Sequence, residues 1–382
     1  MLTMTRSNPA LRELFDSLSA RKRLPAVLIV DLFGADAFDV AVEFHMSPYV
    51  FYATTANFLS FCLHLPKLDE TVSCEFRCLT EPVKIPGCVP ITGKDFVDPA
   101  QHRNDDAYKW LLHSAKRLRE AKGVLVNSFF DLEPNAIKAL QEPGPDKPPV
   151  YPIGPLVNTS SSYVNVKDES ECLNWLDKQP FDSVLYISFG SGGTLTLEQF
   201  NELALGLADS EKRFIWVIRS PSGIASSSYL NPHSQTDPVT FLPLGFLDRT
   251  KEKGLVVRSV MGSTDSNPGS SINIIVNGVP LIAWPLFAEQ KMNALLLAED
   301  VGVALRVLAG EDGIVRREEV VRVVKELMEG EEGKAIGNKM KELKEGIVTR
   351  ALGDDGFSTK SFSELLLKWK AHQREINQDT SH

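Results

Sequence analysis

A glycine-rich turn, Gly190-Ser191-Gly192-Gly193, follows the apolar run 183–189 and precedes a predicted helix. At such a junction, backbone N–H groups and the helix dipole can hold a phosphate. The nicotinamide dinucleotide fingerprint is not matched, because Leu195 stands where its third glycine belongs and Arg219 stands where it requires an acid. This excludes a dehydrogenase of that type. Two interpretations stay open, a phosphate-binding turn and an ordinary tight turn.

Asp31 follows the continuous apolar run 26–30, which is typical of a parallel strand covered on both faces. Ligands bind at the carboxyl ends of the strands in open α/β sheets, so Asp31 is a candidate site residue. A helix N-cap or a loop acid is the competing interpretation. Two further acids lie nearby: Asp36 could cap the helix predicted at 36–45, and Asp39 is expected to face solvent on that helix.

Glu289 and Gln290 open a predicted helix that follows a buried strand and a proline-containing loop. An acid in the first turn complements the helix dipole, which is a sufficient structural reason for Glu289. The helix dipole gives no such structural reason for Gln290, although glutamines exposed to solvent are common. The histidines at positions 45, 64, 102 and 113 are favoured as surface or packed residues over catalytic bases.

Alternating apolar strands and amphipathic helices predict an α/β fold with parallel sheets that position these residues. In the first half we expect strands at 26–31, 49–52 and 123–127, helices at 36–45 and 104–121, and an irregular stretch at 65–101. In the second half we expect strands at 183–189 and 214–218 and helices from Thr196 and at 316–329, 338–349 and 361–370. A capping box, Thr196-x-x-Gln199, is predicted to start the first of these helices.

Composition changes sharply between Pro143 and Ser170, where prolines, glycines and serines cluster. Such a segment is typical of an interdomain linker. We therefore expect an N-terminal domain over 1–150, a linker over 151–170, a C-terminal domain over 171–355, and a C-terminal helix and tail over 356–382.

Length and composition exclude several classes of protein. The 382 residues suffice for two ordinary domains, and the formal charge of −9 argues against nucleic acid as the main partner. The 5 cysteines form no disulfide framework, and Cys74 and Cys78 lack a second pair that would complete a metal site. No apolar run approaches the roughly 20 residues that span a bilayer, and no signal peptide is evident. We expect a cytoplasmic monomer without a metal.

Five segments together resemble plant family-1 UDP-glycosyltransferases, most of all the hydroquinone glucosyltransferase (arbutin synthase) branch. They are the segments 30–34, 65–70, 188–194, 216–221 and 279–294. The resemblance extends from Thr3 to about residue 370. It implies a GT-B type fold of two facing Rossmann-like domains. The first domain would bind a small phenolic acceptor, partly through the stretch 65–101. The second would bind UDP-glucose as donor substrate, with no cofactor.

The resemblance also implies roles for four residues. Asp31 matches the aspartate that orients a catalytic histidine during inverting transfer, which is general-base catalysis. Ser191 matches the position that approaches the donor phosphate. Glu289 and Gln290 match the acid–amide pair that hydrogen-bonds the sugar hydroxyls, and a glutamine at the second position is associated with glucose.

The sequence departs from the family pattern in two places. The catalytic histidine, the opening strand and the next βα units of the family have no counterpart, so we expect an incomplete first domain with an exposed sheet edge. Between Arg258 and Gly278 the Trp-Ala-Pro-Gln and His-Cys-Gly-Trp-Asn-Ser segments of the family's signature box are missing. In the family these segments hold uracil, ribose and phosphate.

Three interpretations follow from these departures. The first is an inverting O-glucosyltransferase by descent that is impaired or inactive, because it lacks a base and part of its donor site. The second is a non-catalytic protein of the same fold that binds a phenolic or a partner chain. The third is an incomplete gene model or splice product.

Overall fold

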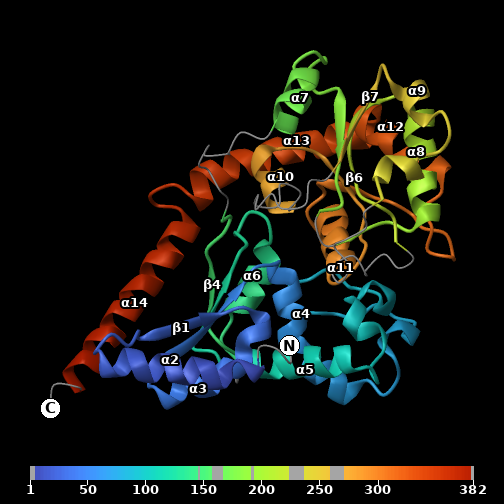
Figure 1. Ribbon diagram of the computed structural model, residues 1–382. Coiled ribbons are helices and arrows are strands. Elements are labelled where there is room, and N and C mark those ends of the chain that lie inside the picture. Colours follow the sequence, from blue (N-terminus) through green and yellow to red (C-terminus); the bar gives the residue numbers. More distant parts are fainter. Residues whose placement is uncertain are drawn as a thin grey trace. The chain divides into compact units, whose positions relative to one another are not determined.

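The computed structural model describes residues 5–144, 147–156, 167–190, 193–222, 236–258 and 271–379 (Figure 1). The chain divides into two compact units. Unit 1 comprises Met1–Leu156, Lys291–Val301 and Glu345–His382, and unit 2 comprises Val157–Gln290 and Gly302–Lys344.

Unit 1 is built on a parallel sheet with the strand order β1-β2-β3-β4. The strands are β1 (Val27–Val30), β2 (Ser47–Tyr52), β3 (Gly123–Val126) and β4 (Val150–Pro152). Val30 lies opposite Val50, so β1 and β2 end close together. Because all four strands run in the same direction, Asp31 lies at the carboxyl edge of this sheet, as predicted.

Helices cover both faces of the sheet in unit 1, because successive strand residues point to opposite sides. Val124 and Val126 pack in the large core that also contains residues of α4, α5 and α6. Leu125, between them, packs with Leu365 of α14 on the other face. These helices are α4 (Ala56–Thr71), α5 (Asp106–Leu118), α6 (Pro134–Gln141) and α14 (Phe357–Asp379).

Shorter elements complete unit 1. Those before β3 are α2 (Asn8–Ala20), η1 (Leu32–Ala37), α3 (Phe38–Glu43), η2 (Phe76–Cys78), η3 (Gly93–Asp95) and η4 (Asp98–Gln101). The later ones are the end of α11 (Gln290–Leu295), the π-helix η7 (Leu296–Asp300) and the π-helix η8 (Ile347–Ala351).

Two elements of unit 1 differ from the sequence prediction. The stretch from residue 65 was expected to be irregular, but α4 continues through Pro66 to Thr71. Proline inside a helix removes a hydrogen bond. Here Leu65 and Leu68 are buried in the core, which offsets that cost. The strand β4 lies within the proline-rich stretch 143–170, where no strand was predicted.

Unit 2 contains a parallel sheet with the order β5-β6-β7 and a parallel pair, β8-β9. The strands are β5 (Val184–Ile187), β6 (Arg213–Ile218), β7 (Gly254–Arg258), β8 (Leu281–Ala283) and β9 (Ala304–Arg306). Ile187 is paired with Trp216, so β5 ends beside the middle of β6. The predicted strands at 183–189 and 214–218 are confirmed.

The core of unit 2 lies between its sheet and two crossing helices, α8 and α12. Gly206 of α8 permits their close approach, because a Cβ at this position would lie 2.6 Å from Cβ of Val320. The helices are α7 (Lys167–Leu176), α8 (Leu197–Ser210), η6 (Pro238–Phe241), α9 (Phe246–Thr250), α10 (Ser271–Asn277), α12 (Arg317–Glu329) and α13 (Glu331–Gly346). In the part of the chain that the structure describes, no helix combines the length and the apolar character needed to cross a membrane.

Candidate functional site

The glycine-rich turn follows β5, as the sequence predicts. Gly190 has a φ of +70°, a conformation that glycine adopts without strain. Its N–H donates a hydrogen bond to Oγ of Ser188 at 3.3 Å. Ser191 lies outside the described residues, so its role stays a prediction. Beyond the turn, Oγ1 of Thr194 donates to Oγ of Ser222 at 2.9 Å.

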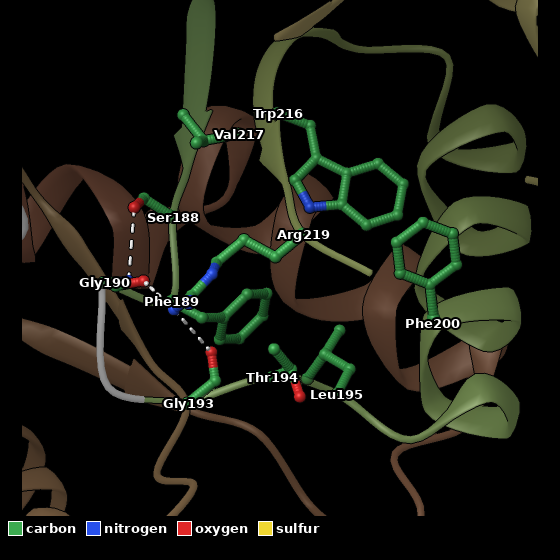
Figure 2. Close-up of a pocket in the computed structure, with 10 residues that line it drawn as sticks. All are labelled: Ser188, Phe189, Gly190, Gly193, Thr194, Leu195, Phe200, Trp216, Val217 and Arg219. Atoms are coloured by element: carbon green, nitrogen blue, oxygen red, sulfur yellow. Dashed lines mark hydrogen bonds between the residues drawn. The ribbon is translucent and has the colours of Figure 1, made fainter. Parts of the chain in front are cut away.

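The side chain of Arg219 reaches back from the end of β6 to the two ends of this turn (Figure 2). Its Nη1 donates to the carbonyl oxygen of Gly190 at 3.3 Å and to that of Gly193 at 3.4 Å. Burial lowers the pKa of the Arg219 guanidinium, but arginine keeps its charge at neutral pH. A positive charge therefore lies beside the turn that was predicted to bind phosphate.

The hollow lined by Arg219 and the turn is small. Its volume is about 20 Å³, and Phe200 and Trp216 form one of its walls (Figure 2). A space of this size holds about one water molecule. The hollow is therefore too small for a phosphate-bearing ligand.

The loop that leads to Glu289 and Gln290 packs directly on the turn. A Cβ built on Gly193 would lie 2.8 Å from the Phe287 ring, so glycine is needed for this close contact. The Phe189 and Trp284 rings meet edge to face with their centroids 5.7 Å apart. The structure thus brings the predicted turn and the predicted acid–amide loop into one cluster within unit 2.

Gln290 has a local structural role that its sequence position did not reveal. Its side-chain Oε1 accepts the N–H of Leu286 at 2.8 Å and that of Phe287 at 3.4 Å. The side-chain oxygen of Gln290 therefore links the end of this loop to the backbone of the residues just before it. Glu289 is partly buried in the same loop.

In unit 1, Asp31 caps the 3₁₀ helix η1. Its Oδ1 accepts the N–H groups of Phe33 and Gly34, each at 2.9 Å. The cap interpretation of Asp31 is therefore confirmed. Within the described residues, Oδ2 of Asp31 has no hydrogen-bond partner, and the residue is exposed. The carboxylate can thus act as a cap and still accept a bond from a ligand or a base.

Asp36 does not cap a helix, contrary to its predicted role. Its carboxylate accepts hydrogen bonds from Oγ1 of Thr5 and Nε2 of His113, both at 2.7 Å. The pKa of Asp36 is lowered: burial, the largest influence, opposes ionisation, but the His113 and Thr5 contacts outweigh it. Asp39 is exposed as predicted, and its Oδ1 accepts a bond from Arg117 at 2.8 Å.

Among the described residues, no three His, Cys, Asp or Glu side chains gather in a way that could hold a metal ion. Sequence reasoning did not identify Arg219 as part of the site. In the sequence, Arg219 was noticed only because it occupies the position where a nicotinamide-binding protein has an acid. That observation excluded a dehydrogenase but gave Arg219 no role.

Two α/β units with parallel sheets, one with a glycine-rich turn at a strand end, fit the GT-B class of sugar-nucleotide transferases. A family model described as "UDP-glucoronosyl and UDP-glucosyl transferase" matches residues 166–342. The chain belongs to this family and is a UDP-glycosyltransferase by descent.

Particular relatives are similar over almost the whole chain. UDP-glycosyltransferase 72B2 of Arabidopsis thaliana is 76% identical over 100% of this chain and 82% of its own length. Hydroquinone glucosyltransferase of Rauvolfia serpentina is 56% identical over 97% of this chain and 81% of its own length. The solved structure of Phytolacca americana UGT2 complexed with UDP-2fluoro-glucose and pterostilbene is 47% identical, with a TM-score of 0.85 over 97% of this chain and 82% of that one. The predicted GT-B fold with parallel sheets is confirmed.

Proposed function

We propose that this chain transfers glucose from UDP-glucose to the hydroxyl group of a small phenolic acceptor, with inversion at the anomeric carbon. The observation that carries the proposal is the cluster in unit 2 formed by the glycine-rich turn, Arg219 and the Gln290 loop. The 56% identity to a hydroquinone glucosyltransferase supports a phenolic acceptor.

The proposed roles follow the chemistry of each group. Ser191 contacts the donor diphosphate, and Glu289 and Gln290 bind the glucose hydroxyls. The phenol oxygen bonds to the anomeric carbon while the bond from that carbon to UDP breaks, and the phenol proton passes to a base other than the family's histidine, which has no counterpart in this sequence. Asp31 orients that base through its Oδ2, because Oδ1 already accepts the η1 cap bonds.

We assign acceptor binding and donor binding to different halves of the chain. Residues 1–150 form the acceptor-binding domain and residues 171–355 the donor-binding domain, joined by a linker at 151–170 and followed by a helix and tail at 356–382. We also propose that the protein is a cytoplasmic monomer, and the reaction as written needs no metal ion.

We further propose that the donor is bound weakly and that activity is impaired. The segment 258–278 lacks the Trp-Ala-Pro-Gln and His-Cys-Gly-Trp-Asn-Ser motifs, which in the family resemblance hold uracil and phosphate. Loss of phosphate donors removes transition-state stabilisation as well as ground-state affinity. The same observation favours a second candidate function, a non-catalytic protein that binds a phenolic.

Titration calorimetry with UDP-glucose and with hydroquinone separates these two candidates, together with mass spectrometric detection of the glucoside. The enzyme is expected to bind both ligands and to form product. Tight binding of the phenol without binding of UDP-glucose would favour the non-catalytic candidate. A chimera that carries the corresponding segment of UDP-glycosyltransferase 72B2 in place of 258–278 is expected to bind UDP-glucose more tightly. Unchanged affinity would contradict the weakening that we attribute to this segment.

Substitutions at Gln290 are expected to separate its structural role from its proposed contact with glucose. Gln290→Glu keeps an oxygen that accepts the Leu286 N–H but removes the side-chain N–H₂ donor. Affinity for UDP-glucose should fall about tenfold, while affinity for UDP stays unchanged.

Gln290→Ala removes both functions, because the Leu286 N–H also loses its acceptor. This variant should bind UDP as well as UDP-glucose less tightly. Calorimetry with both ligands measures the difference. Equal losses for UDP and UDP-glucose in Gln290→Glu would argue against a contact between Gln290 and glucose.

A further inference from the structure

We propose that a pocket in unit 1 binds the aromatic ring of a small neutral phenol. The pocket has a volume of about 250 Å³, and its lining residues come from α2 with its N-cap, β1 and η1. Both candidate functions of this chain require a site for the ring of a phenolic ligand. The inference rests on the proposed function and deepens it, because it names where the acceptor binds.

The size and the lining of the pocket suit a single aromatic ring. Leucine, valine, alanine and glycine supply five of its eight lining residues. Ligand pockets are mostly apolar with a few polar groups, and an apolar cavity of about 150 Å³ is enough to bind benzene. Leu11 of α2 and Leu28 of β1 both pack against the small core that contains Phe15, so two elements of the fold hold the walls.

The pocket borders the cap formed by Asp31. Gly34 lines the pocket, and its N–H is one of the two that the Asp31 carboxylate accepts. A Cβ on Gly34 would lie 2.8 Å from Cβ of Val30, so glycine is needed for η1 to approach β1 this closely. The pocket therefore adjoins the carboxyl edge of the sheet, where ligands of open α/β folds bind.

Asp36 restricts the charge of the ligand. Among the described residues that line the pocket, Asp36 alone carries a charge. Each of its carboxylate oxygens accepts one hydrogen bond, from Nε2 of His113 or Oγ1 of Thr5, and can accept a second. A phenol hydroxyl can donate that bond, whereas a phosphate or a carboxylate would be repelled. An ammonium ion would lose its hydration against the apolar walls, which leaves a neutral phenol as the favoured class.

Leu11→Phe tests the proposal, because the larger side chain fills the pocket from α2. Phenol binding to the whole chain is measured by ligand-observed NMR without UDP-glucose. We expect a Kd on the order of 1 mM for the wild type and at least about tenfold weaker binding for Leu11→Phe. The melting temperature should not fall, because the added carbons occupy empty space. Leu14→Phe is the matched control on the same helix. Leu14 is 51% exposed, so this variant should bind phenol like the wild type.

Leu28→Phe fills the pocket from β1 and is the second variant, in case Leu11→Phe does not fold. Anisole tests the contact with Asp36, since it has the same ring without a hydroxyl donor. The wild type should bind phenol about tenfold more tightly than anisole, and Asp36→Asn should reduce this difference. Equal losses for phenol and anisole in Asp36→Asn would contradict the hydrogen bond to the carboxylate.

Glucosylation of hydroquinone separates the pocket from the proposed function. Leu11→Phe should raise KM for hydroquinone more than it lowers kcat. Unchanged phenol affinity in both filling variants, or no phenol binding by the wild type, would overturn the pocket. If the filling variants glucosylate hydroquinone with the KM of the wild type, the acceptor binds elsewhere and the proposed function stands without this pocket. If the wild type binds phenol and the filling variants do not, but no glucoside forms, the proposed function fails and the pocket stands.

Discussion

Replacement of Glu133 by alanine is expected to lower the melting temperature by about 6–12 °C, which corresponds to about 3 kcal/mol. Glu133 is 1% exposed, and its carboxylate accepts the N–H groups of Ala56 at 2.9 Å and Asn57 at 2.7 Å. The hydroxyl group of Ser128 also donates to it. Without the carboxylate, these three buried donors would lose their acceptor.

The effect should be large because Glu133 acts on an element distant in the sequence. Ala56 and Asn57 form the first turn of α4, whose N–H groups have no partner within the helix. Thr55 caps only the N–H of Phe58, at 3.2 Å. Glu133, which immediately precedes α6, therefore completes the cap of α4 and joins the two helices.

Glu142→Ala is the matched control, because Glu142 follows the other end of α6 and is exposed. Its removal should change the free energy of unfolding by less than about 0.5 kcal/mol. Similar losses of stability for the two variants would show that burial and the cap contacts of Glu133 are not the cause.

The stability that Glu133 contributes should also depend on pH. Burial is the largest influence and raises the pKa of Glu133 above its ordinary value of 4.5, although the three hydrogen bonds it accepts act in the opposite direction. The folded state then holds this proton at pH values where the unfolded state has released it. The contribution is therefore complete below about pH 4.5 and declines as pH rises through the raised pKa. The difference in melting temperature between wild type and Glu133→Ala should narrow as pH increases over this window.

Much of the fold around the site could be predicted, because buried parallel strands are continuous apolar runs. The run at 26–31 contains β1, and the run at 183–189 contains β5. The order of strands within each sheet could not be predicted, because it depends on pairing between distant segments. β4 was not predicted, because it has only 3 residues and lies among prolines.

The capping box predicted at Thr196 shows why local sequence patterns could not predict some of the contacts. Oγ1 of Thr196 accepts the Gln199 N–H at 3.2 Å, as that motif requires. The Gln199 side chain does not return to Thr196. It bonds instead to the backbone of Val315, with Nε2 donating to the carbonyl oxygen and Oε1 accepting the N–H, both at 2.8 Å. Spacing within a helix cannot reveal a partner 116 residues away.

The same limit applies to Arg219 and Gln290. The turn was predictable because a strand, glycines and a helix follow one another in the sequence. The contact of Arg219 with Gly190 joins residues 29 positions apart, which follow the ends of two neighbouring strands, β6 and β5. The bond from Leu286 to Gln290 is local, but it depends on the conformation of a loop for which the sequence gives no regular pattern.

Asparagine at position 31 is expected to lower kcat/KM for glucosylation of hydroquinone about 10²-fold without changing the melting temperature. Asparagine and aspartate are comparable N-caps, because the side-chain oxygen of either accepts the same backbone N–H groups. Asparagine places a neutral N–H₂ group where aspartate has Oδ2. It therefore removes the negative charge that the proposed mechanism uses to orient and stabilise a protonated base.

Two further variants separate the cap from the charge. Asp31→Ala loses both, so it should lower activity similarly and also cost about 1 kcal/mol of stability through the lost η1 cap. Asp39→Asn removes an exposed acid only a few residues away and should leave kcat/KM within about twofold of the wild type. Full activity in Asp31→Asn would mean that Asp31 is a cap and nothing more. A loss of activity that appears only in Asp31→Ala would lead to the same conclusion, because the cap is the one function that alanine removes and asparagine keeps.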